Sequence, residues 1–448
     1  MAEFDTLLKG GTVVGEYGND RFDIGISSGK IAAVGADLGD SATETLDLGG
    51  CLILPGGIDP HVHFNEPGRT HWEGWATGSR ALAAGGATSC IEMPLNAHPP
   101  TLDRESFNAK RAAAEASSIV DFALWGGLTP VNVDRMEELA ECGVIGFKAF
   151  LSHSGMDDFQ AADDLTLFRG MEKAVKFALP VAVHAENDGI TAGLAAAAIA
   201  RGKVTPRDYL NSRPVVAELE AVNRCLLLAR ETGCALHIVH VSSGKAVALI
   251  AEARATGVDV TCETCPHYLL FTGEDMERVG AALKCAPPLR DTSTREDLWT
   301  MVKSGEVDMI ASDHSPSPPE MKQADTVFEA WGGISGCQHT RAAMFTGGKK
   351  RRLSPSQIAQ MTAGSVASRF RLAGKGRIAV GYDADLSWGA MQPDRPIAAS
   401  DVHYRYPDSP WNDLEFSYRH LGTMLRGSLI FRGGVFPDGA RGRFLRPA

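Results

Sequence analysis

The sequence predicts an α/β fold in which a (β/α)₈ barrel of the TIM type carries a small β-sandwich domain formed by both termini. Three observations support this prediction. The middle of the chain alternates short apolar runs with longer segments of helical periodicity, which indicates a parallel sheet. Both ends consist of short β-rich runs separated by glycines. The length of 448 residues suits a barrel at 55–375 with a companion domain at 1–54 plus 376–448.

The two ends of the chain are expected to meet in one β domain. Neither end has a long amphipathic helical pattern, and Gly, Pro and Asp interrupt the apolar runs. The expected strands are Thr6–Leu8, Thr12–Val14, Asp23–Ser27 and Lys30–Val34 at the first end, and Arg377–Val380, Ala384–Trp388 and Met424–Phe431 at the second.

The apolar runs between these ends are expected to be the barrel strands. A doubly wound open sheet is the alternative, but no G-x-G-x-x-G follows the first run to favour it. The expected strands are Gly57–His63, Thr88–Pro94, Val120–Gly126, Val144–Phe150, Pro180–His184, Ala235–Val241, Val258–Cys265 and Asp308–Ser312. Helical spacing occupies His71–Ala84, Leu102–Ala116, Asp134–Cys142, Leu165–Ala178, Val216–Thr232 and Gly244–Thr256.

Composition excludes several classes of protein. The net charge of −11 argues against non-specific binding to nucleic acid or to anionic membranes. The first residues lack the pattern of a signal peptide, and no apolar run has the length of a membrane span. With nine scattered cysteines, an odd number, these features predict a cytoplasmic protein with reduced thiols. Cys262 and Cys265 are interpreted as buried strand cysteines, because no second C-x-x-C pair follows.

Histidines and one aspartate lie where the predicted strands end. His61 and His63 are two positions apart, so both side chains leave the first strand on the same face and can reach one cation. His184 ends the fifth strand and Asp313 follows the eighth. On the sixth strand, His237 and His240 are three positions apart, so we expect only one of them to point into the barrel. We assign His240 to the site and interpret His237 as a structural histidine.

Lys148 lies inside the apolar run of the fourth strand, where an unpaired ammonium is costly. One interpretation pairs Lys148 with a buried acid. The other is a lysine with a depressed pKa that reacts with CO₂ and bridges two metals as a carbamate. Its position among ligand-type residues favours the second interpretation. The carboxyl ends of barrel strands share one face, so these residues are expected to meet there. Nitrogen and carboxylate ligands suit Zn²⁺ and also Mn²⁺, Co²⁺ or Fe²⁺.

These motifs resemble the amidohydrolase superfamily, in the cyclic-amidohydrolase branch of dihydroorotases, hydantoinases and allantoinases. Gly57–His63 resembles the opening motif of that branch, and Gly376–Leu386 resembles the stretch that leads back into its β-sandwich. The likeness covers nearly the whole chain and thins at Pro393–His420. The closest resemblance is to the allantoinases, through Glu66–Gly74, Ile91–Asn96 with Pro99–Thr101, Ser312–Pro316 with Pro318–Lys322, and Glu329–Ile334.

Differences from the dihydroorotases and hydantoinases also favour a resemblance to the allantoinases. Dihydroorotases usually hold the substrate carboxylate with an arginine, an asparagine and a histidine; the matching positions here are Asn65, Ala286 and Ser317. Hydantoinases commonly have a tyrosine where this chain has His153. Hydantoinase, dihydropyrimidinase or dihydroorotase activity remains the alternative. Non-catalytic assembly proteins that resemble hydantoinases lack metal ligands, whereas every ligand position is filled here.

The resemblance implies a site with two divalent metal ions per subunit, zinc above all. It implies that Asp313 takes a proton from the attacking hydroxide and delivers it to the departing ring nitrogen of a small cyclic amide, allantoin, to give allantoate. It also implies a homotetramer. One metal would be held by His61, His63 and Asp313, the other by His184 and His240, with the carbamate of Lys148 between them; Asn96, Ala286 and Trp331 are the expected substrate contacts.

Overall fold

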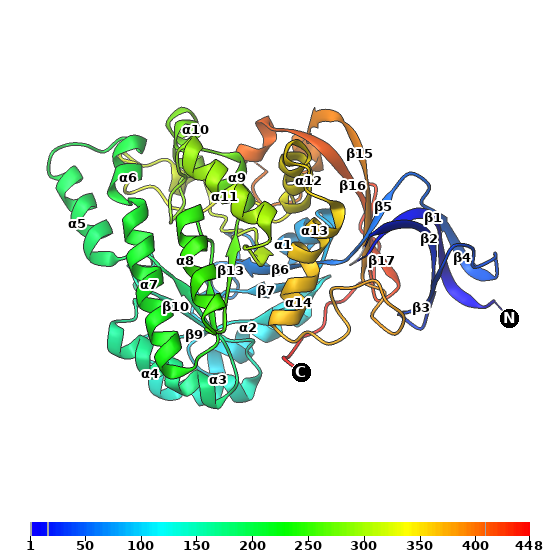
Figure 1. Ribbon diagram of the computed structural model, residues 1–448, viewed down its shortest axis with the longest axis horizontal. Coiled ribbons are helices and arrows are strands. Elements are labelled where there is room, and N and C mark those ends of the chain that lie inside the picture. Colours follow the sequence, from blue (N-terminus) through cyan, green and yellow to red (C-terminus); the bar gives the residue numbers. More distant parts are fainter. Residues whose placement is uncertain (1, 16–17, 408) are drawn as a thin grey trace.

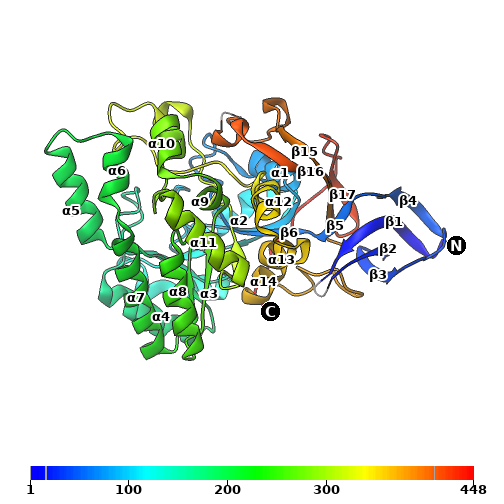
Figure 2. The ribbon, with the colours of Figure 1, turned by 45° about the horizontal axis from the view of Figure 1, so that its top comes forward.

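The structure, a computed structural model, describes residues 2–15, 18–407 and 409–448. Figure 1 shows helices around a group of short strands on one side and a curved sheet that carries the N-terminus on the other. This is an α/β fold of the TIM-barrel type with an additional β domain. Figure 2 shows the same division from a second direction, with α5 and α6 at the end remote from the β domain.

Parallel strands in the middle of the chain follow one another in space in their sequence order. The last returns to the first, because the N–H of His63 donates to the carbonyl of His314 (2.8 Å) and Val62 bridges His314. The eight predicted runs all contain strands, and the third is divided at Trp125. The bounds are β6 Gly57–Val62, β7 Ala87–Glu92, β8 Asp121–Leu124, β9 Gly126–Gly127, β10 Phe147–Phe150, β11 Val181–His184, β12 Leu236–Ile238, β13 Val260–Thr264 and β14 Met309–Ile310.

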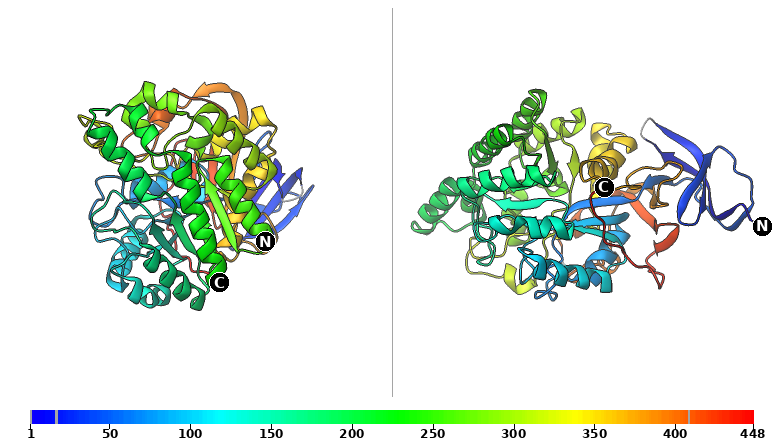
Figure 3. Two further views of the ribbon diagram at one scale, coloured as in Figure 1. Left: turned by 60° about the vertical axis from the view of Figure 1, so that its left-hand side comes forward. Right: turned by 90° about the horizontal axis from the view of Figure 1, so that it is seen from below.

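Helices connect these strands and cover their outer side, as the two views of Figure 3 show. Each predicted helical segment contains a helix. The bounds are α1 Trp75–Ala84, α2 Arg104–Ser117, α3 Met136–Cys142, α4 Asp164–Lys176, α5 Asp188–Ile199, α6 Pro206–Ser212, α7 Val215–Thr232, α8 Gly244–Ala255, α9 Pro266–Leu270, α10 Gly273–Val279, α11 Thr292–Ser304, α12 Thr340–Arg351, α13 Pro355–Ala359 and α14 Ser365–Arg369, with short helical turns η1 Val133–Arg135, η2 Gly280–Leu283, η3 Pro319–Lys322, η4 Gln360–Gly364, η5 Ala399–Asp401 and η6 Pro410–Asp413.

Strands from both ends of the chain pair in one sheet of mixed direction, in the order β17-β16-β15-β5-β1-β2-β3, with β4 beside β1. The parts of the chain that the sequence assigned to a common β domain therefore do meet. The bounds are β1 Phe4–Val14, β2 Asn19–Ser27, β3 Lys30–Gly35, β4 Ala42–Asp47, β5 Leu52–Pro55, β15 Leu386–Pro396, β16 Glu415–Leu425 and β17 Ser428–Arg432.

Three details of this sheet differ from the sequence prediction. Met424–Phe431 is not one strand, because the chain turns at Arg426 and Gly427, which have positive φ, so that the end of β16 pairs with β17. Thr6–Leu8 and Thr12–Val14 belong to a single strand, because Gly10 (φ 72°) makes an irregularity in β1 instead of a turn. Arg377–Val380 is not a strand. Glycines with positive φ flank it, and its neighbour Gly381 folds back so that its N–H donates to the carbonyl of Ile31.

Buried charges join the sheet to the barrel. The ammonium of Lys375 lies 2.7 Å from carboxylate oxygens of both Asp121, at the start of β8, and Asp385, next to β15. The guanidinium of Arg426 also contacts Asp121. None of the helices in the described part of the chain combines the length and the apolar character that spanning a membrane requires.

Candidate metal centre

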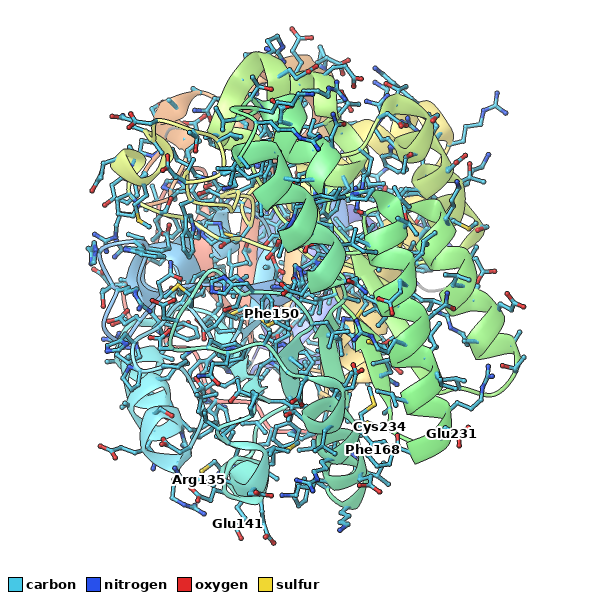
Figure 4. The ribbon with its side chains drawn as sticks, turned by 90° about the vertical axis from the view of Figure 1, so that its left-hand side faces the viewer. Arg135, Glu141, Phe150, Phe168, Glu231 and Cys234 are labelled. Carbon is cyan, nitrogen blue, oxygen red and sulfur yellow. The ribbon has the colours of Figure 1, made fainter. Side chains whose placement is uncertain are left out.

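A pocket of about 430 Å³ opens at the carboxyl ends of the parallel strands. It is lined by His61, His63, His184, His240 and Asp313, all five predicted from the sequence. In Figure 4, Phe150 at the carboxyl end of β10 lies near the middle of the view. Cys234, just before the amino end of β12, lies toward the lower edge. The pocket thus belongs to the end of the barrel where strand side chains and the following loops converge.

His61, His63 and Asp313 form one group of ligand atoms within 4.8 Å of one another. The Nε2 atoms of His61 and His63 lie 3.1 and 3.6 Å from Oδ1 of Asp313. Asp313 reaches this point because its backbone adopts a left-handed conformation (φ 46°), which turns its side chain away from the direction that strand alternation would give.

His184 and His240 form a second group beside the first. Nδ1 of His184 lies 3.1 Å from Nε2 of His240, and the rings of His240 and His61 are centred 5.4 Å apart. Burial lowers the pKa of His184 and of His240, so both rings are neutral near pH 7. Two buried, neutral nitrogens that face each other fit a shared divalent cation, because each presents a lone pair.

The expectation that only one of His237 and His240 points into the barrel is wrong. His237 pairs with Ala182, which is on the same face of its strand as His184, so His237 also points inward, one layer deeper. His240 reaches the pocket because a left-handed conformation (φ 38°) follows the end of β12 and breaks the alternation. The structural role of His237 is supported by its ring, which contacts Thr261 (2.9 Å) and Glu263 (3.1 Å).

Lys148 on β10 is fully buried and is not among the residues that line the pocket. Its charge affects the pKa of His63 and of His184, so it lies near both histidine groups. Its Nζ contacts the carbonyl of Ala149 (3.2 Å) and the ring of Phe150 (3.8 Å from the centroid). Within the described residues, it forms no ion pair within 4 Å, which excludes a direct salt bridge to a buried acid there. Burial lowers the pKa of Lys148 to about 7, so a large fraction of the amine is uncharged at neutral pH, as reaction with CO₂ requires.

Three buried side chains contact the outer nitrogens of the histidines: two glutamates outside the predicted set, and Asn96, which was expected to contact substrate. Nδ1 of His61 lies 2.5 Å from Oε1 of Glu263, and Nε2 of His184 lies 2.9 Å from Oε2 of Glu186. Nδ2 of Asn96 lies 3.3 Å from Nδ1 of His63. The two carboxylates accept hydrogen bonds from His61 and His184, which fixes the orientation of these rings and leaves the other nitrogen of each free for a cation. An acid inside a predicted strand, as at Glu263, or just after one, as at Glu186, is a sequence signal for a buried carboxylate.

Glu186 has a second partner, Arg213, whose guanidinium lies 3.1 Å away and lines the pocket. Burial would raise the pKa of Glu186, but the positive charges of Arg213 and His184 outweigh it and hold the pKa at about 2. For Glu263, burial is likewise outweighed by His61 and His237, and its pKa is about 2. Both acids are therefore ionised, and each can accept a hydrogen bond from a ligand histidine.

Replacing Glu263 by Gln tests this outer layer. The amide keeps the shape of the side chain but loses the charge that orients His61, so we expect metal affinity to fall by roughly 10- to 100-fold. Metal content after dialysis against a graded series of chelator concentrations measures the change. Glu252→Gln, at an exposed position on α8, is the matched control. Unchanged affinity in the Glu263 variant would show that the contact does not support the ligand.

The expected substrate contacts Asn96, Ala286 and Trp331 all line the pocket, as does His153. The backbone carbonyl of Asn96 is itself bonded to Arg69 (3.1 Å), so this residue also ties its loop to the barrel. Asn65 and Ser317 are buried and do not line the pocket. Asn65 is instead within 3.4 Å of the carbonyl of Pro316, so neither position presents a cation to a substrate carboxylate.

The chain is similar to known proteins in sequence and in structure. The chain is 56% identical over 448 residues to a protein named allantoinase from Rubrobacter xylanophilus, covering 100% of this chain and 98% of that one. It is 52% identical to a protein of the same name from Deinococcus radiodurans, over 99% of both chains. The L-hydantoinase (dihydropyrimidinase) of Arthrobacter aurescens has a similar structure, with a TM-score of 0.95 and 33% identity over 99% of this chain and 100% of that one.

The dihydropyrimidinase of Brevibacillus agri is also similar in structure, with a TM-score of 0.91 and 29% identity over 99% of this chain and 98% of that one. The sequence model of the amidohydrolase family matches residues 52–430, which include every strand of the barrel and every predicted ligand. The chain is therefore a member of the amidohydrolase family.

Proposed function

We propose that this protein is an allantoinase, which opens the hydantoin ring of allantoin by hydrolysis to give allantoate. The observation that carries the proposal is full-length identity of 43–56% to proteins named allantoinase, from organisms as different as Rubrobacter xylanophilus and Escherichia coli. The site supports it, because the pocket at the barrel mouth brings five ligand-type residues together.

We assign the two groups of ligands to two divalent cations. His61, His63 and Asp313 would hold one, and His184 and His240 the other, with Lys148 as a carbamate between them. Nitrogen and carboxylate donors suit Zn²⁺, with Mn²⁺, Co²⁺ and Fe²⁺ as further candidates. When bound, such cations polarise a carbonyl group and lower the pKa of water.

Asp313 supplies the proton transfers. Burial raises its pKa, but the neighbouring histidines outweigh that effect and hold the carboxyl group well below its ordinary range, so it is ionised at neutral pH. It can take the proton of the attacking water and pass it to the departing ring nitrogen. One carboxylate serves both steps because the proton only moves across the site.

The walls of the pocket suit a neutral ring. Ala286 presents no charge, and backbone groups of Cys285 and of Trp331–Gly333 also line the pocket. The cations of Arg213 and Lys284, which line the pocket, both have partners: Arg213 pairs with Glu186, and Lys284 donates to two backbone carbonyls of the pocket wall. Allantoin, a neutral hydantoin ring with a ureido arm, needs hydrogen bonds and no cationic clamp.

Turnover of allantoin, a 5-alkyl hydantoin and dihydroorotate should be compared on one metal-loaded preparation. We expect the highest kcat/KM for allantoin. Loss of a buried charge-assisted contact typically costs ~2–5 kcal/mol, so dihydroorotate should be slower by roughly 30- to several-thousand-fold. Plain hydantoins should also be slower, because they leave polar groups opposite the ureido arm unpaired. A higher kcat/KM for either competitor would contradict the assignment and leave the metal site standing.

The proposed function goes with a division of the chain into two domains. We assign residues 55–375 to a complete (β/α)₈ barrel and 1–54 plus 376–448 to a β-sandwich. Support comes from the bridge that joins the first and last parallel strands and from the sheet shared by both ends.

We also propose a cytoplasmic homotetramer. Exposed apolar side chains on α5 and α7, among them Ile199 and Leu227, support association, and light scattering in solution tests it.

A further inference from the structure

Two lysines bind the backbone of the loop Phe328–Gly333, which forms one wall of the pocket. The ammonium of Lys284 donates to the carbonyls of Phe328 (2.9 Å) and Ala330. The ammonium of Lys322 donates to the carbonyls of Trp331 (2.9 Å) and Gly333 (2.6 Å). Four carbonyls of one six-residue loop are thus held by two side chains from outside it.

Two backbone hydrogen bonds lock the loop to the same lysine-bearing segments. The N–H of Gly333 donates to the carbonyl of Lys284 (2.8 Å), and that of Trp331 donates to the carbonyl of Met321, next to Lys322 (2.8 Å). At Gly333 (φ 145°) a side chain would meet the carbonyl of Ser315 at 2.3 Å, so the loop has little freedom to shift.

Neither lysine has an acidic partner within 4 Å among residues 2–15, 18–407 and 409–448. Lys284 is buried, and burial lowers its pKa to about 8; Lys322 is half-buried, and burial together with the charge of Lys284 lowers its pKa to about 7. A lysine whose partners are all carbonyls does not stabilise the fold through an ion pair. Its structural effect in this protein is to fix the positions of those carbonyls, because each lysine has at least two N–H donors for its two carbonyls in either protonation state, and the bonds are stronger when the donor is charged.

The loop is placed to touch substrate. Ala330, Trp331, Gly332 and Gly333 line the pocket together with His61, His63 and Asp313. Lys284 also lines it, whereas Lys322 does not. Lys322 can therefore influence a bound ring only through the loop.

We infer that Lys284 and Lys322 are positioning residues that hold the loop Phe328–Gly333 in the shape needed to bind a cyclic ureide. The inference rests on the proposed function, and it adds a determinant of substrate binding outside the metal ligands. It also gives a role to Lys322, the last residue of the segment Pro318–Lys322 that the sequence comparison singled out.

Lys322→Met tests the inference, since methionine keeps the length of the side chain and removes the three donors. We expect kcat/KM for allantoin to fall by roughly 10- to 100-fold, mainly through a higher KM, because a displaced contact wall misplaces the ring. Metal content should stay unchanged. Hydrogen exchange followed by mass spectrometry should show faster exchange at Trp331 and Gly333, whose N–H groups are bonded across the loop. Lys322→Arg, which keeps charged donors, should recover most of the affinity.

Lys303→Met makes the same chemical change on an exposed part of α11 and is the matched control. Wild-type kcat/KM and wild-type exchange in Lys322→Met would overturn the inference, as would a loss of metal with unchanged loop exchange. If Lys322→Met does not accumulate as folded protein, Lys322→Gln is judged by the same criteria. Failure of the wild-type protein to hydrolyse allantoin would contradict the proposed function but not the role of the lysines. The exchange measurement would still show whether Lys322 holds the loop in place.

Discussion

Lys148→Ala should lose bound metal and lower kcat/KM for allantoin by about a thousandfold. The substitution removes a buried strand lysine near both histidine groups, and with it the carbamate that would join the cations. Loss of transition-state charge stabilisation worth about 4 kcal/mol corresponds to roughly three orders of magnitude. Elemental analysis of the purified variant and steady-state kinetics at saturating Zn²⁺ measure the two effects.

Three controls make this result specific to the bridge. Lys303→Ala, at an exposed position, should behave as wild type. Wild-type protein stripped by a chelator and reloaded with Zn²⁺, Mn²⁺ or Co²⁺ gives the reference for metal loss alone. Short carboxylic acids added with metal should partly restore the Lys148 variant by supplying a bridging carboxylate. An unmodified Lys148 ammonium in well-resolved electron density of metal-loaded protein near neutral pH would refute the carbamate.

Asp313→Asn should reduce kcat by roughly 10²- to 10⁴-fold, the range for removing a positioned general acid–base group. The amide keeps an oxygen that can approach a cation, so metal content should fall far less than in Lys148→Ala. It cannot take a proton from water at neutral pH, because it has no basic carboxylate oxygen. KM should change little, since neither ring recognition nor the pocket walls are altered.

The comparison of kcat with metal content separates the two roles of Asp313. Asp297→Asn on the exposed side of α11 is the matched control and should show wild-type kinetics. A variant that retains wild-type kcat while fully metal-loaded would exclude Asp313 as the proton carrier. A variant that loses all metal would show that ligation is its main contribution.

The sequence by itself determined the repeating pattern of the fold and most of the site. The spacing of His61 and His63 sufficed because side chains two positions apart in a strand share a face whatever surrounds them. Lys148 could be identified because an ammonium inside an apolar run is costly, so its presence there demands an explanation. Local rules of this kind need only neighbouring residues.

Only the tertiary structure decided how His240 and Asp313 enter the pocket. Both adopt left-handed backbone conformations at the ends of short strands, where side chains no longer alternate between the two faces. The argument from their spacing was therefore wrong in placing His237 and His240 on opposite faces. Gly10 is similar, since the chain around it stays in one strand only because partner strands hold it.

The outer contacts of the site also depended on the fold. Glu263 is 202 residues from His61 in the sequence. Lys322 lies in a turn that hydrophobic periodicity does not predict, and it donates to the loop Phe328–Gly333 from there. Hydrogen bonds between distant segments depend on where the barrel brings strand ends and loops together, and that is set by packing of the whole chain. The sequence therefore indicated which residues gather at the pocket, and tertiary structure decided what holds them in position.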